Sequence, residues 1–324
     1  MSGEMPGNPT ATHGLSRRAF TTLALTSIPG FLNAEPKVTI SGFEYMSLRT
    51  VASYFGMRYN WLQSAKSARL SSQWTSMDYT LNQRYQTLNG TRVYLGAPIA
   101  LHKDTLHVSQ IDYERTLQPL LTPKVFNKVP KLYHIVIDPG HGGHDVGAHN
   151  KQLNISEKAP ALSVSLRLGN ALGKLGYKVS YTRTNDNYLT LDERSAFLKK
   201  QNADLFISVH FNSTGTESVS GVETFVMTPQ NQASTSGHPT KNIDKRFYTG
   251  NNNDVWNTLS GFYVQRELAK LPSTNDRGLK RARFAVLREA DCPAMLIEGG
   301  FLGQQLRECP RQCQCGEQCQ YRYF

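Results

Sequence analysis

Short apolar runs alternate with longer amphipathic segments along the second half of the chain. The strand-like runs, each bounded by Gly, Pro or polar residues, are residues 133–138, 177–182, 205–210, 222–227, 284–287 and 294–298. The helix-length segments are residues 157–175, 189–201 and 255–271. Strands that alternate with helices predict an α/β fold with a mostly parallel sheet flanked by helices on both faces.

The first part of the chain has a different pattern, with short strand-like runs and few helices. Residues 45–56 have the apolar spacing of a short helix that ends at a Gly. Residues 92–96 and 105–109 are typical of strands in a small sheet. We therefore expect a small α+β accessory domain over residues 37–121, ahead of the α/β domain.

The remaining boundaries follow from composition. Residues 122–131 carry two prolines and three lysines, which indicates a linker to an α/β domain at residues 132–303. Residues 304–324 form an atypical tail that is rich in Gln, Arg and Cys. Its cysteines have the spacing C-x3-C-x-C-x3-C, which differs from structural zinc sites, so disulfides and a poorly ordered tail both remain open. These cysteines are Cys309, Cys313, Cys315 and Cys319.

The first module resembles the small copper-amine-oxidase N-terminal-like domain that is attached to many cell-envelope enzymes. The matching pieces are residues 46–52, 55–56, 59–61 and 88–90, followed by a late strand. The resemblance implies an accessory or binding role and implies neither catalysis nor copper.

The N-terminus has the order of an export signal. Arg17 and Arg18 precede a mildly apolar stretch at residues 21–32, and Ala34 is a small residue suited to cleavage. The twin arginines are typical of the twin-arginine export route, while an ordinary secretory signal or a disordered basic tail are the alternatives. Residues 1–34 therefore predict an exported protein of the periplasm or cell wall.

Charge and hydrophobicity narrow the class of partner. The formal net charge is +11 and 39% of residues are hydrophobic. No apolar run reaches the length of a membrane span, so no integral membrane segment is expected in the mature chain. The positive charge favours an anionic partner, but no nucleic-acid-binding motif is present, so we expect no nucleic acid. Anionic cell-envelope polymers suit the same charge.

Four residues suited to metal chemistry lie at the ends of these elements. His141 and His210 follow or end apolar strands, Glu157 begins a helix, and Glu298 ends the last strand. The carboxyl ends of parallel strands meet at one edge of a sheet, so we expect these side chains to converge. Two imidazoles and one carboxylate suit a catalytic Zn²⁺ that keeps one position for water. Glu298 is then left as general base and proton donor.

Each of these residues also has a plainer interpretation. A histidine at a strand end is commonly a hydrogen-bonded core or surface residue. Glu157 taken alone is typical of a carboxylate at a helix N-terminus. Glu298 needs a partner, because a carboxylate at the end of an apolar strand loses hydration. His144 and His149 remain alternatives to His141 as the first ligand, and His141 is preferred.

Residues 133–303 resemble the catalytic domain of the amidase-3 family, the zinc-dependent N-acetylmuramoyl-L-alanine amidases of bacterial cell walls. The motifs are residues 137–143 with Asp145 and Gly147, then 157–158, 182–184, 191–194, 203–213, 221–225, 277–288 and 293–302. The resemblance implies His141, Glu157 and His210 as zinc ligands and Glu298 as the catalytic carboxylate. It further implies zinc-activated water that cleaves the amide bond between N-acetylmuramic acid and L-alanine in peptidoglycan.

The chain departs from the family pattern at two points. Pro160 lies in the helix after Glu157, where a first turn tolerates proline because that N–H has no helical partner. After Leu302 the family continues into an acidic segment and a last helix, whereas this chain enters its Cys-rich tail. We expect Arg183 and Arg194 to be scaffold residues.

Three further expectations complete the analysis of the sequence. Asn212 is a candidate for supporting the ligand His210 or contacting substrate, and Cys292 is predicted to be a small core residue. Two other functions remain: a zinc peptidase or other metal-dependent amide hydrolase of the envelope, and a catalytically inactive wall-binding protein. The expected partner is peptidoglycan, and no activator is identified.

Overall fold

The computed structural model describes residues 37–62, 66–122, 131–151, 153–212, 219–272 and 274–302. The predicted export signal, the body of the predicted linker and the Cys-rich tail lie outside these residues. No helix in the described ranges is both long and apolar enough to cross a membrane. We call residues 37–122 the N-terminal module and residues 131–302 the α/β region.

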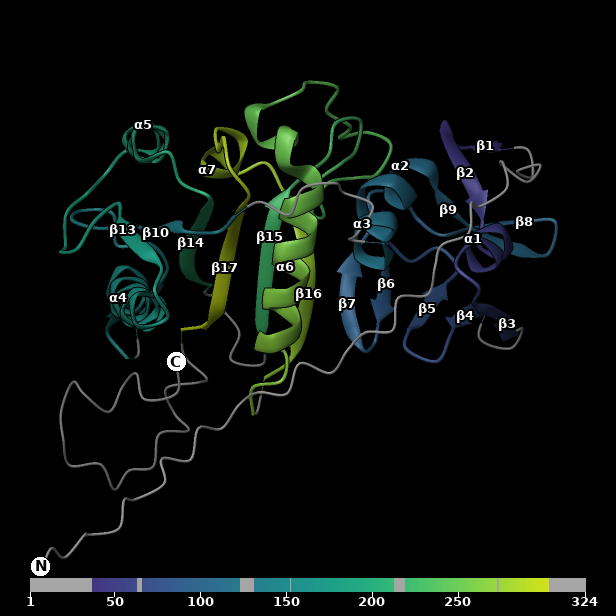
Figure 1. Ribbon diagram of the computed structural model, residues 1–324, viewed down its shortest axis with the longest axis horizontal. Helices are drawn as coiled ribbons and strands as arrows, with labels where there is room; N and C mark the ends of the chain where they lie inside the picture. The colour runs from purple at the N-terminus through teal and green to yellow at the C-terminus, as the bar shows by residue number, and fades with distance from the viewer. Residues whose placement is uncertain are drawn as a thin grey trace, which may run out of the picture. The chain divides into compact units, whose positions relative to one another are not determined.

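Six strands of the α/β region form one half of a large mixed sheet (Figure 1). Their order is β13-β10-β14-β17-β15-β16, and every neighbouring pair is parallel except β15 and β17. The strands are β10 (His134–Pro139), β13 (Lys178–Tyr181), β14 (Leu205–Asn212), β15 (Val222–Met227), β16 (Asp276–Ala282) and β17 (Ala294–Phe301). A short hairpin of β11 (His149–Asn150) and β12 (Ile155–Ser156) stands apart from this sheet.

Helices cover both faces of this part of the sheet, as the alternating pattern predicts. One face packs against α4 (Lys158–Lys174) and α6 (Asp254–Leu268), and α6 lies across β15 and β16 (Figure 1). The other face packs against α5 (Leu191–Gln201) and α7 (Ala285–Arg288). A 3-10 turn, η4 (Thr249–Asn253), leads into α6. Neighbouring buried residues such as Ile135 and Val136 enter different clusters, because successive side chains point to opposite faces.

Local sequence explains where these helices begin and end. The hydroxyl of Thr190 accepts from the backbone of Glu193 while the Glu193 carboxylate accepts from the backbone of Thr190, a capping box that starts α5. Asn202 adopts a left-handed conformation at the other end of α5. Pro160 lies in the first turn of α4, where the sequence predicts that it is tolerated.

Two elements differ from the sequence prediction. Residues 284–287 are not a strand: Phe284 is extended, and Ala285–Arg288 form the short helix α7. Val286 and Leu287 are buried against the face of the sheet that α5 also covers, so a helical turn buries this apolar run as a strand would. The strand β16 was not predicted, because Lys280 and Arg281 mask its apolar alternation.

The N-terminal module continues the same sheet. Its strands extend the order as β16-β7-β6-β5-β4-β3, with β7 parallel to β16 through Leu279 and Val93 and the remaining pairs antiparallel. These strands are β3 (Arg58–Leu62), β4 (Ser67–Ser71), β5 (Ser76–Thr80), β6 (Tyr85–Leu88) and β7 (Thr91–Tyr94). The sheet as a whole is therefore mixed, and the mostly parallel sheet and separate accessory domain are not confirmed.

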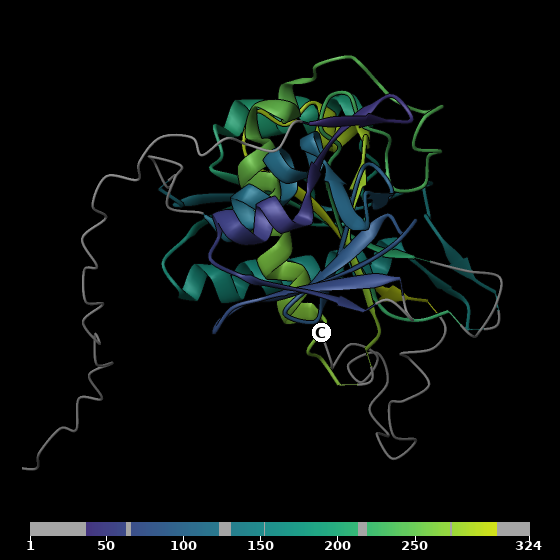
Figure 2. The same cartoon turned by 90° about the vertical axis from the view of Figure 1, so that its right-hand side faces the viewer.

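A second, four-stranded sheet and short helices complete the N-terminal module (Figure 2). Its strand order is β1-β2-β9-β8. The strands are β1 (Val38–Ile40), β2 (Phe43–Ser47), β8 (Ala100–His102) and β9 (Thr105–Ser109). The helices are α1 (Leu48–Tyr54), α2 (Gln110–Asp112), the π-helical turn η2 (Tyr113–Leu117) and α3 (Gln118–Leu121). The predicted helix and strands at residues 45–56, 92–96 and 105–109 correspond to α1, β7 and β9.

Buried polar contacts join the module to the α/β region. Arg281 of β16 is only 2% exposed, and its guanidinium donates to the hydroxyls of Thr116 and Thr258, each at 2.9 Å. Asp112 of α2 accepts from the Gln232 side chain at 2.9 Å. Because both contacts are buried, each side of this junction depends on the other for hydrogen bonding.

Candidate functional site

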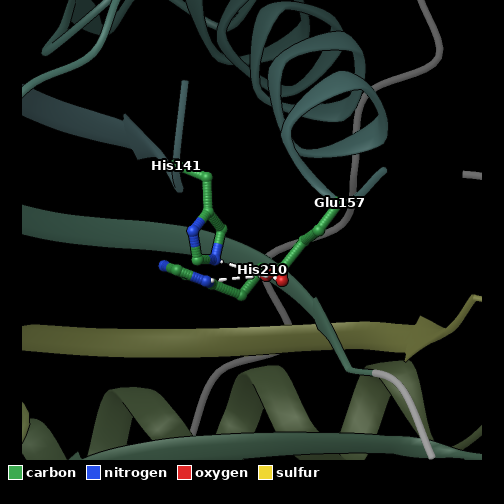
Figure 3. Close-up of side chains that lie close together, drawn as sticks. All are labelled: His141, Glu157 and His210. Atoms are coloured by element: carbon green, nitrogen blue, oxygen red, sulfur yellow. Dashed lines mark hydrogen bonds and ion pairs between the residues drawn. The ribbon is translucent and has the colours of Figure 1, made fainter. Parts of the chain in front are cut away.

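Three side chains singled out in the sequence lie together at one edge of the sheet. His141 follows β10 after one residue, His210 lies near the end of β14, and Glu157 immediately precedes α4. One donor atom from each residue lies within 4.8 Å of the other two. Figure 3 shows the two imidazoles and the carboxylate pointing toward one another. The structure therefore brings together the three residues predicted as metal ligands.

Glu157 is the centre of this cluster. Its Oε2 lies 3.1 Å from His141 Nε2, and its Oε1 lies 2.8 Å from His210 Nδ1. Backbone N–H groups of Ala148 and Phe211 also donate to the two carboxylate oxygens, at 2.8 and 3.0 Å. Burial opposes ionisation, but the hydrogen bonds from both histidines hold the pKa of Glu157 well below its usual range. Glu157 is therefore an ionised ligand candidate.

Asp145 fixes the second nitrogen of His141. Its Oδ2 lies 2.9 Å from His141 Nδ1, while His141 Nε2 faces Glu157. Burial works against the charged imidazole, yet the hydrogen bonds to Glu157 and Asp145 raise the pKa of His141. A carboxylate behind a histidine is the arrangement that orients metal-binding imidazoles. In the sequence, only its place in the motif, four residues after His141, marks Asp145, and the sequence analysis gave it no role.

The loop that carries His141 needs close backbone approaches. His141 itself has φ +60°, a left-handed conformation that is rare outside glycine. A Cβ on Gly140 would lie 2.4 Å from the His210 ring, so only glycine fits beneath that imidazole. A Cβ on Gly147, at φ +65°, would lie 2.6 Å from Glu157 Oε2. These glycines let the loop fold onto the ligands.

Two buried arginines hold the loop from behind. Arg194 donates to Asp138 Oδ1 at 2.6 Å and to the carbonyl of His141 at 2.8 Å. Arg183 donates to the carbonyl of Gly140 at 2.6 Å. Their guanidinium groups thus satisfy loop carbonyls and a buried carboxylate, as expected for scaffold residues.

Glu298 lies beside this cluster and differs from Glu157 in its surroundings. It is the direct partner of His210 across the pairing of β14 with β17. Its Oε2 is buried and has no hydrogen-bond partner among the described residues. Burial, opposed by the charge of His210 and helped by the carboxylates of Glu157 and Glu223, raises the pKa of Glu298 to about 7. A carboxyl group that titrates near neutral pH can both accept and donate a proton.

A second charged cluster lies on the other side of Glu298. Glu223 is the direct partner of Glu298 across β15 and β17, and it is 3% exposed. It accepts from Lys280 Nζ, from Arg277 Nε at 2.8 Å and from Asn212 Nδ2 at 3.3 Å. Asn212, a candidate from the sequence, therefore links the strand of His210 to this cluster. Glu223, Arg277 and Lys280 lie within motifs that the sequence analysis recognised without giving these residues a role.

A cleft of about 510 Å³ opens over the candidate site. Its lining includes Tyr188, Leu189 and Leu191 at the start of α5. It also includes Phe284, Ala285 and Val286 at the start of α7. His141, Glu157, His210 and Glu298 line the same cleft.

The donor set fits a catalytic zinc site. His141, Glu157 and His210 supply two imidazoles and one carboxylate, a set that zinc takes in hydrolases while keeping a position for water. The alternatives to His141 lie elsewhere: His144 packs on a tyrosine ring with centroids 4.0 Å apart, and His149 lies 3.0 Å from a serine hydroxyl. Neither belongs to the ligand cluster.

Comparisons with known proteins point in the same direction. Residues 135–308, more than half of the chain, match the model of the Amidase_3 family, described as N-acetylmuramoyl-L-alanine amidase. The chain is 30% identical over 199 residues to the N-acetylmuramoyl-L-alanine amidase AmiC of Neisseria meningitidis, covering 54% of this chain and 46% of that protein. It is 32% identical over 173 residues to the sporulation-specific N-acetylmuramoyl-L-alanine amidase of Bacillus subtilis, covering 53% and 57%. The chain thus spans about half the length of both relatives.

A solved structure gives a further likeness. The crystal structure of N-acetylmuramoyl-L-alanine amidase from Clostridium difficile 630 is 29% identical to this chain, with a TM-score of 0.44. The match covers 59% of this chain and 89% of that one.

Proposed function

Because this chain belongs to the Amidase_3 family of N-acetylmuramoyl-L-alanine amidases, we propose that it hydrolyses peptidoglycan with the help of a bound zinc ion. The bond cleaved is the amide between N-acetylmuramic acid and L-alanine. The observation that carries this proposal is the convergence of His141, Glu157 and His210 beside Glu298 in one open cleft.

His141, Glu157 and His210 would hold the metal. When bound, zinc supplies a Lewis acid for the amide carbonyl and lowers the pKa of a water molecule toward neutrality. Asp145 keeps the imidazole of His141 oriented through its Nδ1 atom. Arg194 and Arg183 keep the loop around His141 in its left-handed conformation. These contacts preserve the ligand geometry before substrate arrives.

Glu298 would move the proton. Its carboxylate accepts a proton from the attacking water and passes it to the amide nitrogen that leaves with the stem peptide. A pKa of about 7 supports both steps, because the ionised and neutral forms are then close in free energy near neutral pH. The unpaired Oε2 supports the same role, since no group among the described residues competes for it.

The proposed place of action is outside the cytoplasm. Residues 1–34 carry the twin arginines and the apolar stretch of an export signal, so the mature enzyme would act in the periplasm or cell wall.

Mass spectrometry of digested sacculi tests this function. Purified sacculi are incubated with the zinc-loaded protein, with the chelated protein and with the chelated protein after zinc is restored. We expect free stem peptides with N-terminal alanine, and glycan strands with intact muramic acid, only where zinc is present. New peptide termini inside the stem would identify a peptidase instead. No release by a folded, zinc-loaded sample would overturn the proposal.

A further inference from the structure

One face of the sheet continues from the candidate site into the N-terminal module. Glu298 of β17 is paired with Glu223 of β15. Phe225, two residues further along β15, is paired with Lys280 of β16. Directly paired residues, and residues two apart in one strand, point to the same face of a sheet. Glu298, Phe225 and Lys280 therefore share one face.

The junction of β16 with β7 carries this face into the module. Leu279 of β16 pairs with Val93 of β7, so these two side chains point to the same face. Their neighbours Lys280 and Tyr94 therefore point to the other face. The Lys280 ammonium lies 5.7 Å from the centre of the Tyr94 ring and 5.5 Å from that of Phe225. These distances place the cation between an aromatic ring of the α/β region and one of the module.

Two tyrosines and an arginine continue the same face. Tyr94 pairs with Tyr85, and their ring centroids are 5.9 Å apart. The guanidinium of Arg92 lies 4.7 Å above the Tyr85 ring. All three side chains are half-buried, so part of each is open to solvent. Aromatic rings with polar atoms at their edges are surfaces that bind ligands of mixed polarity.

Beyond the tyrosines the face becomes polar. The hydroxyl of Thr87 donates to Asp78 at 3.1 Å, and Arg69 donates to the same carboxylate at 2.6 Å. Strands in a sheet are about 4.8 Å apart, so the six steps from β17 to β4 span roughly 30 Å. The face therefore extends well past β17, the strand that carries Glu298.

In the N-terminal module the described helices leave this face open and cover the other one, whereas α5 and α7 pack on it in the α/β region. On the opposite face Leu70, Met77 and Tyr79 are fully buried, and they belong to one core cluster with Leu48 and Val51 of α1. On the open face, by contrast, every residue of β5, β6 and β7 is at least partly exposed. An extended sheet face that no helix covers, beside an active site, suits a long substrate.

We propose that this face, formed by Lys280, Tyr94, Tyr85, Arg92 and Thr87, binds the glycan strand of peptidoglycan next to the bond that is cut. We call it the glycan face. The inference rests on the proposed function and adds to it the surface that receives the polymer. The tyrosine rings pack against the apolar C–H faces of sugar rings. Arg92 attracts the carboxylates that muramic acid and stem peptides carry.

Charge favours a glycan with scattered carboxylates over a densely anionic polymer. Lys280 is already paired with Glu223, and Arg69 with Asp78. Of the three cations Arg92, Lys280 and Arg69, only Arg92 thus has no acidic side-chain partner among the described residues. A polyphosphate chain needs many such cations in a row. Two aromatic rings and one such guanidinium match a sugar polymer better.

Binding of peptide-free glycan strands tests the inference. These strands lack the scissile amide, so the full chain in its zinc-loaded form can be used without turnover. The variants are Tyr85→Ala combined with Tyr94→Ala, and separately Arg92→Gln. The matched control is Tyr263→Ala combined with Arg266→Gln, because that guanidinium also lies over a tyrosine ring, at 4.7 Å, on α6 at the opposite face.

We expect the double tyrosine variant to weaken glycan binding about tenfold or more, since truncated aromatic contacts commonly dominate an interface. Arg92→Gln should weaken it by a smaller factor, and the control should bind as the wild type does. Arg92→Gln also serves if the tyrosine variant unfolds, because only the backbone N–H of Arg92 bonds to Asp276.

Two results would overturn the inference. One is glycan binding that is unchanged in Arg92→Gln and in a folded tyrosine variant. The other is binding of inorganic polyphosphate that exceeds glycan binding and survives the tyrosine substitutions. Stem-peptide release from sacculi by the same wild-type sample reports on the proposed function separately. Release together with unchanged glycan binding in the variants would reject the glycan face alone.

Discussion

Glu298 and His210 are direct partners across β17 and β14, so one edge of the sheet presents a carboxyl group next to an imidazole of the ligand cluster. The two carboxyl groups near that imidazole have opposite surroundings. Glu157 is held by both histidines and two backbone N–H groups, whereas Glu298 has a buried oxygen without a hydrogen-bond partner in the described structure. This difference separates the ligand role from the proton-transfer role.

Replacing Glu298 by Gln should remove activity and spare the metal. We expect the rate of stem-peptide release to fall by about 10²–10⁴, the usual range for loss of a general acid–base group. Zinc content should stay unchanged, because the ligand cluster does not include Glu298. Initial rates and elemental analysis check this. Glu267→Gln, an exposed change at the end of α6, is the control, and retention of a large share of activity in Glu298→Gln would refute the role.

The raised pKa of Glu298 also predicts a pH-dependent stability of the metal-free protein. The folded pKa, about 7, lies above the ordinary value of 4.5, so the proton binds more tightly in the folded state. The stability from this proton is complete below about pH 4.5 and is lost as the pH rises through 7.

Glu298→Gln removes the ionisable group, so the variant does not lose this stability as the pH rises. At pH 8.5 we expect the metal-free variant to exceed the metal-free wild type in free energy of unfolding by roughly 2–3 kcal/mol. At pH 4.5 the difference should nearly disappear. Urea unfolding at both pH values measures it, and an equal difference at the two values would contradict the raised pKa.

Asp145→Asn should weaken metal binding without removing a ligand. Asp145 orients His141 through Nδ1, and loss of such a supporting carboxylate typically lowers metal affinity about 10–100-fold. Competition with a chelator of known affinity measures the change. Asp192→Asn, at an exposed position in the first turn of α5, should bind zinc as the wild type does. Equal affinity in both variants would exclude the supporting role.

Much of the candidate site could be predicted because it depends on local pattern and on strand ends. His141 and His210 follow apolar runs that become neighbouring parallel strands, and Glu157 begins the helix between β10 and β13. The fold of parallel strands then brings these residues to one edge. Their assignment as ligands remains a prediction from the family resemblance and the geometry.

Other features could not be read from local pattern, because distant partners decide them. The run at residues 284–287 fits a strand or a buried helical turn equally well, and packing on the sheet selects the turn. β16 contains Lys280 and Arg281, which hide its alternation until their partners are known. Glu223 lies opposite Glu298 only because β15 runs antiparallel to β17. Periodicity gives no information on that pairing.

The junction around Arg281 predicts that the N-terminal module and the α/β region unfold together. Thr116→Val keeps the side-chain shape but leaves the buried Nη2 donor of Arg281 with only a long contact of 3.5 Å to the Arg115 carbonyl. We expect a loss of about 1–3 kcal/mol in the free energy of unfolding of the full chain, because unsatisfied buried donors carry that cost. The transition should remain single in denaturant. Thr122→Val is the control, since among the described residues its hydroxyl bonds only to the Gln118 carbonyl of its own helix. Two separate transitions, or no greater loss than in the control, would show instead that the module is an independent accessory domain, as the sequence alone suggests.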